Sequence, residues 1–390
     1  MKFILLSGII FIAGIAALLF MQHNNVYTSG SNLKATLPLV ASTTPREEPV
    51  LPLTNPPEVI RAAYYTKYFA SSDKRINNLI ALSQKNLINS VVIDFKDYTG
   101  VLSYDSKIDL AKKYHLSEPI IKDVKALIRK LHQNNIYVIA RISVFQDSAL
   151  VKARPDLAVK SFAHEAPWKD HKGIMWLDAN NQEVWDYIVD ISKELRGDGI
   201  DEINFDYIRF PSDGILSDMR FNWRSEVHSK ALVIKEFVNY LKEKLLPNIP
   251  ISFDIFGQTL INHDDVNIGQ LFENFVFDGS IIAPMVYPSH YVSGFIGYNN
   301  PADHPYEVMK YSLDLALSRI HELEIKSSTT IAVKVRPWVQ FFDLGANYTP
   351  AMINKELASI HDSLATSTVY QGYNFWDPRN LYPGIEQLKL

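Results

Sequence analysis

The hydrophobic positions of this chain fall into short β-rich runs that alternate with longer segments of helical periodicity. Runs of branched and aromatic residues predict strands at 60–65, 90–97, 137–145, 202–210, 251–257, 280–287, 330–338 and 372–377. Apolar residues at helical spacing predict helices at 73–85, 119–134, 182–195, 225–245, 305–323 and 350–364. This alternation is typical of an α/β fold, the (β/α)8 TIM barrel with right-handed crossovers. A doubly wound open sheet is the alternative, although no Gly-x-Gly-x-x-Gly turn follows a predicted strand, which argues against its dinucleotide-binding form.

Charged and polar residues keep to one of the two alternating faces of the predicted strands, and branched apolar residues occupy the other. Because the layer between barrel and helices is dry, we expect the charged face to point to the barrel centre. The residues expected there are Asp94, Lys96, Arg141, Ser252, Asp254, Lys334, Arg336 and Trp338. Single members could instead form buried ion pairs, such as Lys96 with Asp94 or Arg141 with Glu202. As a set they gather near strand C-termini, where barrels build active sites.

Two carboxylates lie near the ends of neighbouring predicted strands. The strand at 202–210 carries Glu202, Asn204 and Asp206 on one face and ends at Pro211, and Asp254 lies near the end of the next strand. Glycoside hydrolysis needs two carboxyl groups, one to protonate the leaving oxygen and one to attack the anomeric carbon or activate water. The pair therefore favours a glycoside hydrolase, with retaining and inverting chemistry both open.

The positive charges near these carboxylates suggest how the two roles divide. Arg209 or Arg141 beside Asp206 would keep that carboxylate ionised, as a nucleophile or base requires. Asp254 is then the expected acid/base, because a proton donor needs a less cationic pocket.

Three loops at strand ends place aromatic rings beside polar groups, at 285–291, 336–340 and 374–378. Flat rings can lie against a pyranose while polar groups meet its hydroxyls, although ordinary loop packing is the alternative for Trp338 and Trp376. The predicted substrate-binding residues are Asp94, Lys96, Arg141, Arg209, Tyr287, His290, Arg336, Trp338, Trp376 and Asp377.

The sequence indicates neither a cofactor nor a metal. His290 has no second ligand at metal spacing, and His263 with Asp264 and Asp265 is typical of a surface loop more often than of a metal site. No Gly-x-Ser-x-Gly elbow, P-loop or His-Glu-x-x-His motif occurs.

Composition narrows the class of protein. The 390 residues are 47% hydrophobic and 21% charged, which is the balance of a chain able to bury a large core. A net charge of -4 provides no basic footprint for a phosphate backbone, so we expect no nucleic acid partner. The chain contains no cysteine, which excludes disulfides, thiol nucleophiles and thiolate metal sites.

The N-terminal segment predicts membrane attachment. After Lys2, an apolar run from residue 3 to residue 21 has the length of a membrane-spanning helix. No small-x-small cleavage site follows it, which favours an uncleaved signal anchor at 1–21 over a cleaved signal peptide. Residues 22–57 are rich in Ser, Thr, Asn and Pro and predict a disordered linker, and residues 58–390 predict one extracytoplasmic domain.

Seven ordered blocks of this domain, within about residues 59–381, resemble a bacterial family of "putative glycosyl hydrolases", formerly a domain of unknown function. The blocks are VVIDFKDYTG at 91–100, IYVIARISVFQD at 136–147, DEINFDYIRFPSDG at 201–214, SFDIFGQT at 252–259, IAPMVYPSHY at 282–291, VRPWVQ at 335–340 and FWDP at 375–378. The resemblance implies a TIM barrel with a carbohydrate-type cleft, distantly similar to the α-amylase type barrels.

The α-amylase type barrels carry a nucleophilic Asp at the end of the fourth strand, and Asp206 matches it by position. Their acid/base is a Glu at the end of the fifth strand, where this chain has the shorter Asp254. Their third acid follows the seventh strand, where this chain has Arg336, Trp338 and Gln340 instead. The resemblance therefore supports the role of Asp206 more directly than that of Asp254.

These observations predict a glycoside hydrolase anchored to the cell membrane, acting on an envelope or extracellular polysaccharide or glycan. A glycan-binding barrel without turnover is the first alternative. A metal-dependent hydrolase or deacetylase is a weaker one, which predicts loss of activity with a chelator.

Overall fold

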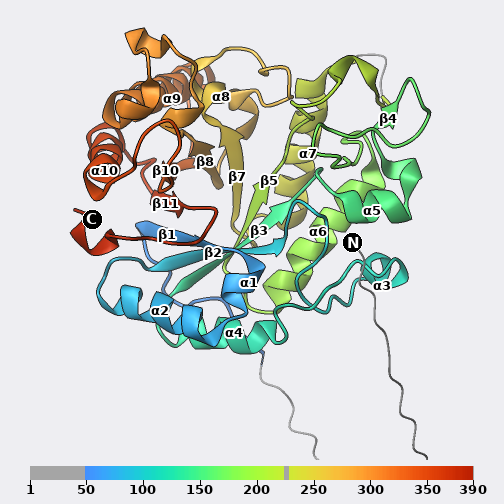
Figure 1. Ribbon diagram of the computed structural model, residues 1–390, viewed down its shortest axis with the longest axis horizontal. Helices are drawn as coiled ribbons and strands as arrows, with labels where there is room; N and C mark the ends of the chain where they lie inside the picture. Colours follow the sequence, from blue (N-terminus) through green and yellow to red (C-terminus); the bar gives the residue numbers. More distant parts are fainter. Residues whose placement is uncertain (1–48, 224–227, 390) are drawn as a thin grey trace, which may run out of the picture. The chain divides into compact units, whose positions relative to one another are not determined.

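The computed structural model describes residues 49–223 and 228–389 (Figure 1). The predicted membrane segment at 1–21 and the predicted linker up to residue 48 lie outside the described residues. Within the described part, none of the helices combines the length and the apolar character needed to cross a membrane.

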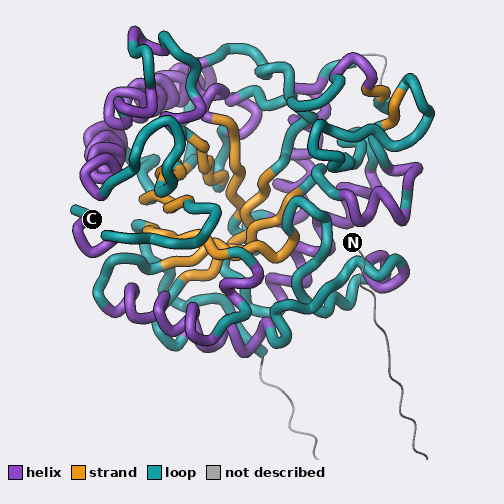
Figure 2. Tube along the Cα trace, viewed as in Figure 1, coloured by secondary structure: helices purple, strands orange, loops and turns teal. Residues whose placement is uncertain are grey.

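A curled sheet of parallel strands lies at the centre, surrounded by helices (Figure 2). The nine strands follow the order β10-β11-β1-β2-β3-β5-β7-β8-β9. Their bounds are β1 Ile60–Tyr65, β2 Ser90–Lys96, β3 Tyr137–Ser143, β5 Glu202–Asp206, β7 Ile251–Phe256, β8 Ser280–Met285, β9 Lys334–Val335, β10 Trp338–Gln340 and β11 Gly372–Trp376. A separate antiparallel pair consists of β4 (Lys160–Ser161) and β6 (Met219–Arg220).

The two edge strands of the large sheet are consecutive along the chain. Only Arg336 and Pro337 separate β9 from β10, and the proline, which has no N–H to donate, interrupts the strand predicted at 330–338. β9 pairs with β8, β10 pairs with β11, and the backbone N–H of Val335 donates to the carbonyl oxygen of Val369 at 2.7 Å. Segment 334–340 is therefore hydrogen-bonded on both sides and joins the two edges of the sheet.

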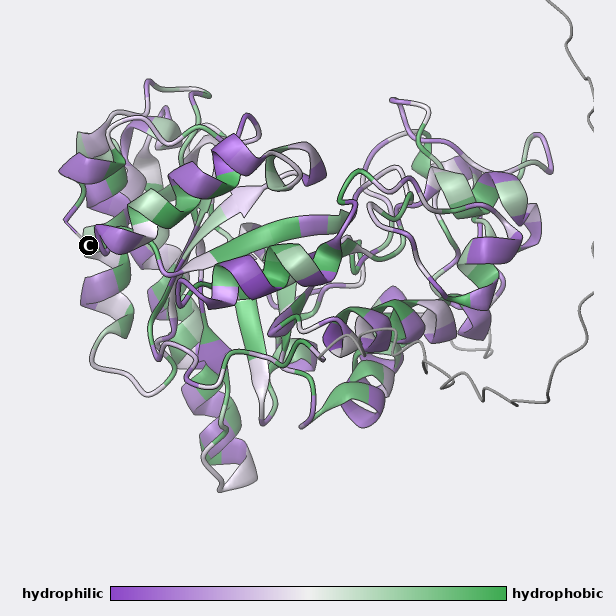
Figure 3. Ribbon diagram, turned by 90° about the horizontal axis from the view of Figure 1, so that it is seen from below, coloured by the Kyte–Doolittle hydropathy of each residue, from purple (hydrophilic) through white to green (hydrophobic). Residues whose placement is uncertain are grey.

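Amphipathic helices cover the outside of the sheet, and Figure 3 shows hydrophilic and hydrophobic residues side by side along them. The longer ones are α2 Asp73–Gln84, α4 Val124–His132, α6 Gln182–Gly197, α7 Lys230–Leu245, α9 Pro305–Ser327 and α10 Pro350–Leu364. The shorter ones are α1 Lys67–Ala70, α3 Asp109–Lys113, α5 Ser148–Ala153 and α8 Gly257–Ile261. Two helices begin about five residues later than expected because Asp123 and Ser229 accept hydrogen bonds from the first turns of α4 and α7.

Buried residues form two apolar clusters on the two faces of the sheet. The larger cluster, between strands and helices, includes Val91, Ile93 and Phe95, as the alternation predicts. The smaller cluster lies on the opposite face and consists of Ile60, Ala62, Tyr64, Val92, Tyr137, Ile139, Ala283, Tyr287 and Trp338. This second face carries the charged residues described below.

A β-bulge redirects Lys96. Asp94 pairs with Arg141, but the register then shifts and Lys96 pairs with Ile142, which belongs to the outer apolar cluster. The ammonium group lies 2.9 Å from Oδ2 of Asp147 and donates to the carbonyl oxygen of Ser143 at 2.6 Å. Lys96 thus forms a fully buried ion pair with Asp147, and its expected position at the barrel centre is not observed.

Replacing Gly100 tests this ion pair. Gly100 has a φ of +87°, and a Cβ there would overlap the carboxylate of Asp147. We expect Gly100→Ala to displace Asp147 from Lys96 and to lower the free energy of unfolding by about 3–5 kcal/mol, measured by urea denaturation. Gly173→Ala is the control, since Gly173 has a φ of +77° with no atom in reach of an added Cβ, and should cost only about 1–2 kcal/mol. Equal losses in the two variants would contradict the role of the Lys96–Asp147 pair.

Candidate active site

One guanidinium group faces three carboxylates at the C-terminal ends of neighbouring strands. Nη1 of Arg141 on β3 donates to Oδ1 of Asp94 on β2 at 2.6 Å, and Nη2 donates to Oδ2 of Asp206 on β5. Nε of Arg141 lies 3.7 Å from Oδ2 of Asp254 on β7. All four side chains are buried. Alternation along parallel strands brings these four residues together on the inner face, as the sequence predicts.

Asp206 is held by a positive charge and a backbone donor. Besides the bond from Arg141, its Oδ1 accepts a hydrogen bond from the backbone N–H of Tyr207 at 2.5 Å. Charge-assisted hydrogen bonds of this kind are among the stronger ones in proteins and fix the position of the carboxylate.

Asp254 lies in a drier environment with neutral donors. Its Oδ1 accepts from Nε1 of Trp338 at 2.7 Å and from Nδ2 of Asn204 at 2.9 Å. Burial, followed by the negative charge of Asp206, raises the pKa of Asp254 to about 7, although Arg141 and the two donors act in the opposite direction. The two neighbouring carboxyl groups thus differ in environment, since Asp206 contacts a cation and a backbone donor whereas Asp254 contacts two neutral side-chain donors.

Asp94 and Tyr64 extend this network on the other side of Arg141. The hydroxyl group of Tyr64 donates to Oδ2 of Asp94. Burial raises the pKa of Asp94 despite the opposing charge of Arg141, and burial together with the charge of Asp94 raises the pKa of Tyr64 well above its ordinary value.

The chain turns sharply directly after Asp206. Tyr207 has a φ of +53°, in the left-handed region that bulky residues rarely adopt. This turn ends β5 four residues earlier than predicted, and Tyr207 lines the cleft while also packing against the larger apolar cluster. Strained backbone of this kind is found at functional sites.

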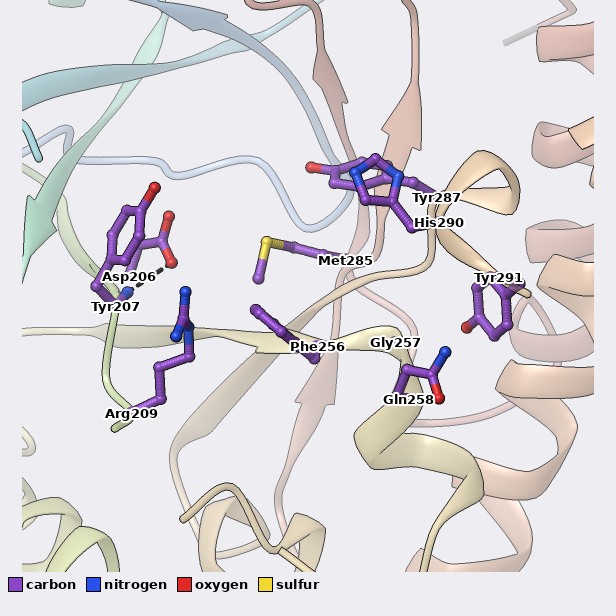
Figure 4. A pocket seen from close by; sticks show the side chains of 10 residues that line it. All are labelled: Asp206, Tyr207, Arg209, Phe256, Gly257, Gln258, Met285, Tyr287, His290 and Tyr291. Atoms are coloured by element: carbon purple, nitrogen blue, oxygen red, sulfur yellow. Dashed lines mark hydrogen bonds between the residues drawn. The ribbon is translucent and has the colours of Figure 1, made fainter. Parts of the chain in front are cut away.

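Two pockets meet at Tyr207. The first, of about 440 Å³, is lined by Asp206, Tyr207, Arg209, Phe256, Gly257, Gln258, Met285, Tyr287, His290 and Tyr291 (Figure 4). The second, of about 570 Å³, is lined by Tyr64, Thr66, Lys67, Tyr68, Asp94, Asp97, Tyr98, Thr99, Val101, Glu118, Arg141, Tyr207, Trp376 and Pro378. A ligand can therefore approach the carboxylate cluster from either side of the Tyr207 ring.

Most of the predicted substrate-binding residues lie at these pockets. Tyr287, His290 and Arg209 line the first pocket, whereas Trp376 lines the second, with its ring centroid 4.1 Å from that of Tyr64. Trp338 is fully buried and reaches the site through its hydrogen bond to Asp254.

Besides Trp338, three predicted substrate-binding residues line neither pocket. Lys96 pairs with Asp147, as described above. Arg336 forms a fully buried ion pair with Glu202, so Glu202 is paired with a different arginine from Arg141, the partner considered from the sequence. The carboxylate of Asp377 is buried and accepts a hydrogen bond from the backbone N–H of Arg379 at 2.7 Å.

Sequence reasoning missed several residues of the site. Ile60, Ala62 and Tyr64 are every second residue of β1 and share its inner face. Applying the strand alternation to every position of β1 would therefore have identified Tyr64. Phe256 and Gln258 follow Asp254 at the strand end, where barrel sites are built, and this position was their only signal.

The described residues contain no group of three or more His, Asp or Glu side chains that could hold a metal ion. Near His263, the carboxylates of Asp264 and Asp265 accept hydrogen bonds from the backbone N–H groups of Val266 and Asn267, two residues further along. Both acids therefore stabilise a local turn.

Comparison with known proteins identifies one family model and several solved structures to which this chain is similar. A family model described as "Putative glycosyl hydrolase domain" matches residues 62–382. The PgaB (BpsB) glycoside hydrolase domain from Bordetella bronchiseptica has a TM-score of 0.58 at 11% identity, over 84% of this chain and 97% of that domain. TtGalA, an alpha-galactosidase from Thermus thermophilus, has a TM-score of 0.50 at 14% identity, over 86% of this chain and 62% of that enzyme. At these identities the two structures show a shared α/β fold alone.

A hypothetical protein from Ruminiclostridium thermocellum ATCC 27405 is 35% identical over 49% of this chain and 96% of its own, with a TM-score of 0.46. No curated protein sequence matches the chain.

Removing Arg141 tests how the carboxylate cluster is stabilised. We expect Arg141→Met to leave buried carboxylates without a counter-charge and to lower the free energy of unfolding by about 3–5 kcal/mol at pH 7. The loss should shrink at low pH, where the carboxyl groups become neutral, and urea denaturation at both pH values measures it. Lys85→Ala, which breaks an exposed ion pair with Glu386, is the control and should cost no more than about 1 kcal/mol. A small, pH-independent loss in Arg141→Met would contradict this account.

Proposed function

We propose, since this chain belongs to the family described as "Putative glycosyl hydrolase domain", that it hydrolyses glycosidic bonds with Asp206 and Asp254 as its two carboxyl groups. The observation that carries the proposal is their electrostatic asymmetry. Arg141 and a backbone N–H hold Asp206, whereas burial and the charge of Asp206 raise the pKa of Asp254 to about 7. A carboxylate paired with a cation, beside a carboxyl group with a raised pKa, is suited to acid/base chemistry.

In this mechanism Asp206, which lines the first pocket, attacks the anomeric carbon or activates a water molecule. Asp254 protonates the leaving oxygen. Trp338 and Asn204 both donate to Oδ1 of Asp254, so its proton belongs on Oδ2. When that proton leaves, the new charge on Oδ2 lies 3.7 Å from Nε of Arg141, which stabilises it.

We also propose that the sheet is a closed eight-stranded TIM barrel. Counted as one strand, segment 334–340 reduces the nine strands to eight, and its hydrogen bonds to both neighbours support closure. The carboxylate cluster then lies at the C-terminal mouth, the usual position of a TIM-barrel active site.

The substrate that we propose is a polysaccharide or glycan of the cell envelope or its surroundings. Pockets on both sides of Tyr207 leave room for sugar units on either side of Asp206, and exposed Tyr68 and Tyr98 offer rings at the second pocket. The extracytoplasmic, membrane-anchored location is part of the proposal and rests on the apolar run at residues 3–21.

A glycan-binding barrel without turnover is the second candidate. The observation in its favour is that Asp254 is only 1% exposed and lines neither pocket, although an acid catalyst must reach the leaving oxygen. The following two experiments separate the candidates.

Neutralising Asp206 tests the proposed nucleophile or base. We expect Asp206→Asn to lower kcat by roughly 10²–10⁴-fold, measured as release of reducing ends from a panel of polysaccharides and peptidoglycan. Asp105→Asn, at an exposed acid far along the chain, is the matched control and should retain full activity. If wild type and Asp206→Asn bind a glycan equally well and neither releases product, the protein is a binding barrel.

The pH profile tests Asp254. Since the proposed acid must carry a proton, kcat/KM should fall as the pH rises through about 7, where Asp254 becomes ionised. Asp254→Asn should lose activity on natural glycosides but retain much of it on aryl glycosides, whose leaving groups need no proton. A variant equally impaired on both substrates, or an unchanged pH profile, would rule out this role for Asp254.

A further inference from the structure

Arg209 is a buried cation on the wall of the first pocket. Its side chain is 8% exposed, and its guanidinium carbon lies 4.7 Å from the ring centroid of Phe256, 4.9 Å from that of Trp176 and 5.4 Å from that of Tyr207. Figure 4 shows the guanidinium group directed between Asp206 and Phe256. Three aromatic rings thus fix the orientation of a positive charge.

Arg209 differs from the other buried arginines of the described residues in having no carboxylate at ion-pair distance. Arg141 contacts Asp206, Arg319 contacts Glu273 and Arg336 contacts Glu202. By contrast, the hydrogen bonds of Arg209 all involve Nη1, which donates to the carbonyl oxygen of Phe210 at 2.9 Å and to Oγ of Ser212 at 3.2 Å.

The opposite edge of this guanidinium group, formed by Nε and Nη2, has no partner among the described residues. Burial lowers the pKa of Arg209, and Asp206, Asp170 and Asp213 compensate only from beyond ion-pair distance. A buried charge without a partner is costly, so it indicates an anion that comes from outside the chain.

The rest of the pocket wall fits an uncharged sugar ring that carries one anionic group. Gln258, Tyr287 and Tyr291 offer neutral polar groups, and burial lowers the pKa of His290, which favours its neutral form. Asp206, the acid in this wall, is already paired with Arg141.

We propose that the first pocket binds a sugar that carries a carboxylate, as in a uronic acid, and that the Nε/Nη2 edge of Arg209 holds this carboxylate with two parallel hydrogen bonds. The planar fork of arginine matches a carboxylate in this way. A single guanidinium edge, without a second cation in the wall, suits one negative charge better than a doubly charged phosphate. This inference rests on the proposed glycosidase site and names its substrate class, an acidic glycan.

Binding measurements test the inference without relying on turnover. The probes are oligosaccharides from pectate, alginate and hyaluronan, each compared with its carboxyl-reduced form, in which CH₂OH replaces the carboxylate. Isothermal titration calorimetry on the full chain carrying Asp206→Asn avoids hydrolysis. We expect at least one acidic oligosaccharide to bind about 10–100-fold more tightly than its reduced form, with a preference that weakens as salt rises.

In the Asp206→Asn/Arg209→Gln double variant, each acidic oligosaccharide and its carboxyl-reduced form should bind with equal affinity. Arg209→Lys in place of Arg209→Gln keeps the charge but loses the fork, and should restore part of the preference. Urea denaturation separates lost recognition from lost folding, because an Arg209→Gln variant that keeps a cooperative unfolding transition but shows no preference has lost recognition alone.

Each result decides the inference separately from the proposed hydrolysis. The carboxylate site is wrong if no acidic oligosaccharide binds more tightly than its reduced form, or if that preference persists without Arg209. It is also wrong if only a sulfated oligosaccharide is preferred. In each of these cases, hydrolysis of a neutral glycan would still support the glycosidase. Conversely, a preference for acidic oligosaccharides only when Arg209 is present, while the protein with Asp206 intact releases no product, would support the carboxylate site and contradict the proposed hydrolysis.

Discussion

The shared guanidinium group of Arg141 is the interaction on which the rest of the site depends. Three carboxylates on the inner faces of adjacent strands would repel one another in a dry interior, and Arg141 makes their proximity tolerable. One positive charge cannot neutralise three negative ones, and burial raises the pKa of both Asp94 and Asp254 against the charge of Arg141. Asp254 has the longest ion-pair distance of the three, 3.7 Å, and the negative charge of Asp206 raises its pKa further.

The same constraint organises the other charges buried with the sheet. Arg336 is paired with Glu202, and Lys96 is diverted by a bulge to Asp147. Only at the pocket does a buried cation, Arg209, lack such a partner among the described residues. The contrast between satisfied charges inside the sheet and an unsatisfied one on the pocket wall is the sign of a surface built to meet a ligand.

Residue alternation predicted the strands well, because both the burial of one face and the pairing of parallel neighbours act on every second residue. It brought Asp94, Arg141, Asp206 and Asp254 together correctly. It could not predict depth along the strands, so Arg336 was expected near their C-terminal ends. Nor could it predict local backbone exceptions: the bulge before Lys96 reversed the expected face of that side chain, and the left-handed turn at Tyr207 ended its strand early.

The pairing of the first strand with the last has a consequence for how the molecule is made. Ile60 on β1 is aligned with Gly372 on β11, so one edge of β1 has no partner until residue 372 has been synthesised. Contacts between residues so distant in sequence form late and slowly, and an unpaired strand edge is open to association with other chains in the meantime. Folding of this domain therefore depends on β11 (Gly372–Trp376), and the interval before this strand is synthesised is when the chain is most vulnerable to aggregation.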